Sequence, residues 1–128
     1  MPSVSRSKKA ILKHISVIAR YTYFENYTAA ERLLNEIKSK IRRRGLWGEG
    51  CFSAAKGLIV AGKEKNRVSL FWKVKNANLR ELSRIKKSLI KDLTRENVDE
   101  FEEGFLEAWI TIIDAFSNVL RQQRRSAK

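Results

Sequence analysis

Apolar residues recur every three or four positions in four segments of the chain, which is the period of an amphipathic helix. These segments predict helices over about 7–24, 28–44, 78–93 and 97–125. The last prediction is the clearest, because acidic side chains crowd its first turns and arginines close it, as the helix dipole favours. We therefore expect a mainly α fold, with basic N-terminal helices followed by a C-terminal helical bundle.

Signals for helix ends support three of these boundaries. Thr28 and Glu31 have the spacing of a capping box at the start of the second helix. Asn97 is the residue type that caps a helix and precedes the acidic first turn of the last one. Gly45 is a typical stop after the second helix, so residues 45–50 are expected to form a glycine-rich turn.

Residues 50–77 allow two interpretations. Between 67 and 75 apolar and polar residues alternate as in a strand, and this segment could pair with 58–60 as a short β-hairpin near 58–75. Val68, Phe71 and Trp72 also have a spacing that suits a helix. Both alternatives stay open from the sequence.

The chain has 128 residues, the length of one domain. Hydrophobic residues make up 43% of it, which is enough to build a core and excludes wholesale disorder. We expect a single domain over 1–128, in which 1–45 forms a basic helical arm and 46–128 a more compact helical core.

Charge is segregated along the chain. The net charge is +13, and residues 1–91 hold 22 Lys and Arg against 6 Asp and Glu. Residues 92–114 hold 8 acids against Arg95 alone. A chain this basic is typical of proteins that bind a polyanion, and nucleic acid is the polyanion we favour.

The densest basic stretch is 38–44, where five of seven residues are cationic. The first helix carries Lys9, Lys13 and Arg20 opposite its apolar stripe, and residues 63–75 form a second basic region around Trp72. The candidate nucleic-acid-binding residues are Arg6, Lys8, Lys9, Lys13, Arg20, Arg32, Lys38, Lys40, Arg42, Arg43, Arg44, Lys63, Lys65, Arg67, Lys73 and Lys75.

The sequence offers little for catalysis. His14 is the only histidine, and it lacks the partners that a metal site or a general base needs. Cys51 is the only cysteine and is expected to be a small buried residue. We expect no enzyme activity, no catalytic residue, no metal, no cofactor and no small-molecule substrate. Because no stretch has the length of a membrane span, membrane contact is expected to be indirect at most.

The segment 21–27 is rich in aromatic residues. Exposed rings can stack on the bases of a single strand. The more common role of such a cluster is packing in the core or against another subunit, and this is the role we expect here.

The basic first helix with Arg6, Lys8, Lys9, Lys13 and Arg20, the second basic helix over 32–44 and the helical C-terminal part resemble the major coat proteins of archaeal filamentous viruses. These viruses include the tristromavirus and lipothrixvirus types. The resemblance covers most of the chain and rests on size, charge layout and helix pattern. It implies paired coat subunits, including a paralogous one, that wrap double-stranded DNA in a helical virion.

Non-specific phosphate contact fits this picture, because no zinc finger or RNA-recognition signature is present. Two alternatives are cellular proteins and not viral ones, and they would be located in the cytoplasm or nucleoid. One is a cellular chromatin or RNA-binding protein, and the other is a small subunit of a nucleic-acid effector complex.

Overall fold

The described residues of the computed structural model, 2–65 and 69–126 with side chains from Ser7 onward, form six helices and no strand. The helices are α1 (Pro2–Tyr23), α2 (Tyr27–Arg42), α3 (Gly45–Glu64), α4 (Leu70–Lys75), α5 (Leu79–Leu93) and α6 (Glu100–Ser126). The expected mainly α fold class is thereby confirmed.

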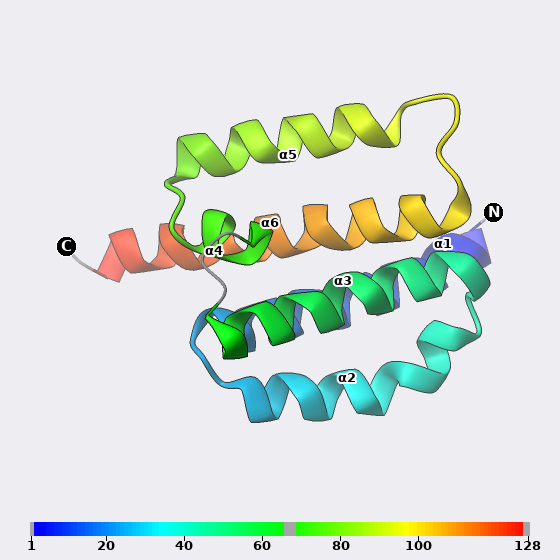
Figure 1. The fold of residues 1–128 in the computed structure, drawn as a ribbon, viewed down its shortest axis with the longest axis horizontal. Coiled ribbons are helices and arrows are strands. Elements are labelled where there is room, and N and C mark those ends of the chain that lie inside the picture. Colours follow the sequence, from blue (N-terminus) through cyan, green and yellow to red (C-terminus); the bar gives the residue numbers. More distant parts are fainter. Residues whose placement is uncertain (1, 66–68, 127–128) are drawn as a thin grey trace.

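The five long helices lie roughly side by side (Figure 1). α1, α3 and α6 run in one direction, and α2 and α5 run in the other. The pairs that pack most closely are α3 with α6, α1 with α6, α1 with α2, and α2 with α3, whereas α5 packs mainly against α6. The bundle therefore has α1 and α3 in its middle, α2 on one side, and α6 followed by α5 on the other.

One hydrophobic core joins the helices. Residues 1–45, expected to be a basic arm, contribute Ile15 and Ile18 from α1 and Leu34 and Ile41 from α2 to the same cluster as Phe116 of α6. α1 and α2 are therefore part of the core as well as carriers of basic residues.

The turn between α1 and α2 is fixed by backbone hydrogen bonds. The amide of Asn26 donates to the carbonyl of Tyr21 at 2.8 Å, and that of Glu25 donates to Thr22 at 3.0 Å. This is the pattern of a Schellman motif, and Glu25 has the left-handed conformation that the motif requires, with φ of 62°. The Asn26 side chain accepts from the amide of Ala29 and caps α2, so the predicted capping box that starts at Thr28 is wrong by two residues.

The predicted glycine-rich turn over 45–50 is the first part of α3. Gly45 does take the left-handed conformation, with φ of 60°, but the chain continues at once into a helix. Glycine is required later in the helix for packing, because a Cβ at Gly50 would come 2.0 Å from the carbonyl oxygen of Phe101. Gly50, one of the glycines that suggested a turn, therefore allows α3 to approach α6 closely.

Residues 58–64 lie in α3 and residues 70–75 form α4, so the described part of this region takes the helical alternative and not the hairpin. Residues 66–68, which include part of the proposed strand, lie outside the described residues. Trp72 donates a hydrogen bond from Nε1 to the carbonyl of Ala61 at 3.1 Å, which ties α4 to the end of α3.

The last two helices begin with side-chain caps. Asn78 and Glu81 form a reciprocal capping box at the start of α5. At the start of α6 the carboxylate of Asp99 accepts from the amide of Glu102 at 2.7 Å. The cap predicted at Asn97 is therefore displaced by two residues, to Asp99.

Candidate nucleic-acid interface

α1 presents a basic face to solvent. Lys9, Lys13 and Arg20 are exposed on it, while Ile11 and Ile15 on the opposite face are buried. The helix contains no acidic residue, so no carboxylate of α1 can neutralise these cations. Three of the predicted binding residues are thus brought onto one helix face.

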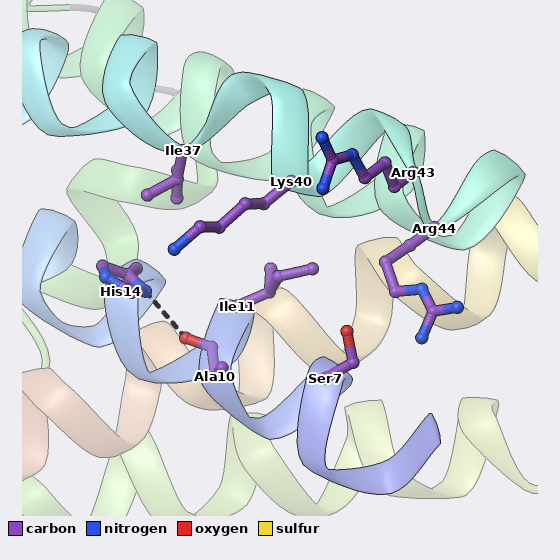
Figure 2. Close-up of a pocket in the computed structure, with 8 residues that line it drawn as sticks. All are labelled: Ser7, Ala10, Ile11, His14, Ile37, Lys40, Arg43 and Arg44. Carbon is purple, nitrogen blue, oxygen red and sulfur yellow. Dashed lines mark hydrogen bonds between the residues drawn. The ribbon is translucent and has the colours of Figure 1, made fainter. Parts of the chain in front are cut away.

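A groove of about 520 Å³ lies between α1 and the C-terminal part of α2. Figure 2 shows Lys40 extending across it toward α1, Arg44 directed toward the first turns of α1, and Ile11 between them. Its lining residues are Ser7, Ala10, Ile11, His14, Ile37, Lys40, Arg43 and Arg44. The groove therefore combines an apolar floor with three cations, and it contains most of the cluster at 38–44.

His14 borders this groove, and one of its two ring nitrogens already has a hydrogen-bond partner. Its Nδ1 lies 2.8 Å from the carbonyl oxygen of Ala10 (Figure 2). Because a carbonyl oxygen only accepts, Nδ1 is the donor in this contact, and Nε2 is the nitrogen left for a further partner. His14 is consequently a polar wall of the groove.

A second basic pocket, of about 240 Å³, lies between α1 and α6. Arg20 of α1 faces Arg121 and Arg125 of α6 there, and Ser16, Asn118 and Gln122 add polar groups. The two arginines of α6 were not among the predicted binding residues, since their position at a helix C-terminus already accounts for their charge. No pattern in the sequence indicates that α6 runs beside α1 in the same direction.

The exposed face of α1 connects the two basic pockets. Ser7 lines the first and Arg20 the second, and at 1.5 Å per residue they lie about 20 Å apart along the helix. This is roughly the rise of six base pairs of duplex, at about 3.4 Å per pair. The two pockets and Lys9 and Lys13 between them therefore form one basic surface, which we call the α1 surface.

Several predicted binding residues have partners within the protein instead. Lys8 pairs with Glu103 at 3.5 Å and lies over the ring of Trp47. Lys63 pairs with Glu31 at 3.1 Å. These two cations stabilise contacts between helices.

Two other lysines lie over aromatic rings. The ammonium of Lys38 is 5.7 Å from the centre of the Phe52 ring, and that of Lys75 is 5.3 Å from the centre of the Trp72 ring. Such contacts are favourable cation–π interactions. Both lysines are half-buried, and neither lines a pocket of the α1 surface.

Of the remaining predicted residues whose side chains the structure describes, none lines a pocket of the α1 surface. Exposed cations elsewhere are Arg32, Arg42, Lys65 and Lys73. The side chains of Arg6 and Arg67 lie outside the described residues.

Most of the acidic residues of α6 have partners inside the fold. Glu102 pairs with Arg95, and Asp114 pairs with Lys86 at 2.7 Å. Glu107 accepts a hydrogen bond from Nε1 of Trp47. Of the two acids in α2, Glu31 pairs with Lys63 and Glu36 is exposed. In the part of the chain that the structure describes, four ion pairs form, so most of the basic excess is not neutralised internally.

The chemistry of the remaining polar groups is limited. Cys51 is buried, its thiol lies 3.3 Å from the carbonyl of Gly104, and burial raises its pKa to about 12. A thiol with this pKa is a poor nucleophile at neutral pH. Within residues 2–65 and 69–126, no group of three His, Cys, Asp or Glu side chains could hold a metal ion.

None of the described helices is both long and apolar enough to cross a membrane. Comparisons of the chain with protein-family models, curated proteins and solved structures give no match.

Proposed function

We propose that this protein is a non-enzymatic nucleic-acid-binding protein that contacts phosphates through the α1 surface. The observation that carries the proposal is the pair of basic pockets on either side of an acid-free helix. The cations of the surface are Lys9, Lys13, Arg20, Lys40, Arg43, Arg44, Arg121 and Arg125.

Contacts of this kind give affinity without reading sequence. Phosphates are identical along a nucleic acid, and Lys and Arg bind them by charge and hydrogen bonding. The cations on the α1 surface are spread over a helix face and two flanking helix ends, an arrangement suited to following a charged backbone.

The salt dependence of binding tests the proposal. Each phosphate neutralised contributes about −0.9 to the slope of log K against log salt, so eight contacts to a duplex predict a slope of about −7. Fluorescence anisotropy with a short labelled DNA duplex between about 50 and 200 mM salt should show an affinity loss on the order of 10⁴. A response that is nearly flat would contradict the proposal.

The particular role that we propose within this class is that of a coat subunit that packages double-stranded DNA in a virion. The support for it is the resemblance in charge layout and helix pattern. The alternatives are a cellular chromatin or RNA-binding protein and a subunit of an effector complex. Electron microscopy of the protein mixed with long duplex DNA separates these roles, because a coat subunit should yield regular filaments and the alternatives irregular or discrete complexes.

A further inference from the structure

The aromatic segment 21–27 divides between the core and the surface. Tyr23 packs edge-to-face on Phe116 of the core, with ring centres 5.0 Å apart. Tyr21 and Phe24 are directed outward and keep 36% and 57% of their surfaces exposed. Together with Val17, Arg20 and Asn26 they line a pocket of about 420 Å³ at the C-terminal end of α1. Of the two roles predicted for this segment, packing in the core applies to Tyr23, and contact with another subunit stays a prediction for Tyr21 and Phe24.

The pocket is held in shape by the turn that follows α1. The Schellman hydrogen bonds of Glu25 and Asn26 fix the backbone on both sides of Phe24. The Phe24 ring also contacts Tyr23 edge-to-face, with centres 5.2 Å apart. Because Oδ1 of Asn26 accepts from the amide of Ala29, the amide nitrogen of its side chain is the group left to donate to a ligand. A ligand would meet rings whose surroundings are already ordered.

Arg20 lines this aromatic pocket and also the basic pocket formed with Arg121 and Arg125. Arg20 therefore joins two adjacent sites. The first site has exposed aromatic rings, and the second has three guanidinium groups. A nucleotide has the same two parts, a flat base and a negatively charged phosphate. Proteins that bind single strands commonly combine stacking rings with a basic groove in this way.

We propose that the pocket of Val17, Arg20, Tyr21, Phe24 and Asn26 binds an unpaired nucleobase, stacked on the exposed rings, while its phosphate meets Arg20, Arg121 and Arg125. The inference rests on the proposed nucleic-acid-binding function, not on the proposed coat role, and specifies the kind of strand that is bound. A duplex hides the faces of its bases inside the stack, so the site selects a single strand or an unpaired end. In this respect the pocket favours a ligand other than the double-stranded DNA that the coat-protein resemblance implies.

A second copy of the chain is a weaker candidate for the occupant. Stable protein interfaces involve about 20–30 residues on each side, whereas the apolar part of this pocket is formed by Val17, Tyr21 and Phe24. A symmetric contact would also bring Arg20 of one copy toward Arg20 of the other, because the same patch meets itself. A flat base needs only the small area that these side chains offer.

The test compares two single-stranded oligonucleotides of about 12 nucleotides, a length within the range that single-strand-binding sites cover. One carries normal bases and the other has the same backbone with abasic sites throughout. The protein is the full chain, either unchanged, as the double variant Tyr21→Ala and Phe24→Ala, or as the control Leu46→Ala and Phe101→Ala. The control removes two side chains that are 54% and 39% exposed at the other end of the bundle. Circular dichroism checks that all three proteins are folded.

We expect the unchanged protein and the control to bind the normal strand more tightly than the abasic strand. The Tyr21 and Phe24 variant should lose about five- to 150-fold in affinity for the normal strand, the range found when a stacking ring is removed, and little for the abasic strand. A Phe24→Trp protein, which keeps a stacking surface at this position, should retain most of the affinity that a Phe24→Ala protein loses.

Three results would overturn the inference. Equal losses on both strands would show that the rings do not contact bases, and the absence of a loss would show that they are not used. A change in sedimentation without a change in single-strand binding would assign the patch to contact between copies. In each of these cases salt-dependent binding of the abasic strand would leave the proposed function standing, whereas failure of the abasic strand to bind at all would contradict the proposed function itself.

Discussion

Gly104 of α6 lies directly against the backbone of Trp47 in α3, and a Cβ at position 104 would come 1.9 Å from the carbonyl oxygen of Trp47. Real Cβ atoms do not approach a backbone atom this closely, so a side chain here must push the two helices apart. Gly104→Ala should therefore lower the free energy of unfolding by about 1–3 kcal/mol or more. Urea denaturation followed by circular dichroism measures the effect.

Gly57 provides the matched control for that substitution. It lies in the exposed part of α3, and a Cβ there would meet nothing within 4 Å. Gly57→Ala should raise the free energy of unfolding by about 0.5–1 kcal/mol, because alanine loses less conformational freedom in a helix. If both substitutions had the same effect, close packing of α3 on α6 would not be the cause.

The buried thiol of Cys51 should make stability depend on pH in alkaline solution. Its pKa rises from 9.0 to about 12 in the folded protein, first because of burial and second because of Glu107. Above about pH 9 the unfolded chain loses this proton while the folded protein keeps it. Stability should then fall by about 1.4 kcal/mol per pH unit until about pH 12.

Cys51→Ala isolates this effect from the titration of other groups, including Tyr27, whose pKa is also raised by burial. The difference in unfolding free energy between the unchanged protein and the variant should be constant below about pH 9. Above that pH the unchanged protein should lose stability relative to the variant, by an amount that grows with pH. Denaturation curves at about pH 8, 9 and 10 suffice. A constant difference at all three values would contradict the raised pKa.

Three cations of the groove between α1 and α2 should contribute strongly to nucleic-acid binding. Lys40→Gln, Arg43→Gln and Arg44→Gln together should reduce the salt slope by about three units, and affinity near 0.1 M salt by about 10- to 100-fold. The reason is that these side chains line one groove, and glutamine keeps the aliphatic stem while removing the charge. The measurement is anisotropy with a labelled duplex.

The triple variant Arg80→Gln, Arg84→Gln and Lys87→Gln is a control with the same change in net charge. These residues are exposed on α5, away from the α1 surface. Affinity should fall much less with this variant. An equal loss would mean that overall charge, and not the α1 surface, determines binding.

Arg121 and Arg125 should be needed for binding although the sequence did not indicate it. Replacing both with glutamine removes two of the three cations of the pocket on α6 and should reduce the salt slope by about two units. Arg124, which is exposed in the same helix but does not line that pocket, serves as the control position. A similar effect from Arg124→Gln alone would contradict the assignment.

The helix pattern of the sequence predicted α1, α2, α5 and α6 to within a few residues at most ends, because each has a distinct apolar stripe. It failed for α3, whose glycines resemble those of a loop when their neighbours are unknown. Gly48 and Gly50 make sense only once the backbones of Ile41 and Phe101 are seen beside them. Close approach of two backbones is a property of tertiary structure, and composition does not reveal it.

The candidate site was predicted only in part, because it too depends on tertiary structure. The charge of Arg43 and Arg44 is visible in the sequence, and so is the basic face of α1. The sequence does not show which cations have internal partners, such as Lys8 with Glu103, or that Arg121 comes to lie near Arg20. Both facts depend on which helices are neighbours in the folded bundle.

The position of α5 at the edge of the bundle has a consequence for the motions of the molecule. The helix packs mainly against α6, and Leu82 is its one fully buried side chain. The energy that holds it in place therefore comes largely from a single interface, so we expect α5 to detach while α1, α2, α3 and α6 stay together. Hydrogen exchange at its amides should then follow a local opening that leaves both pockets of the α1 surface intact.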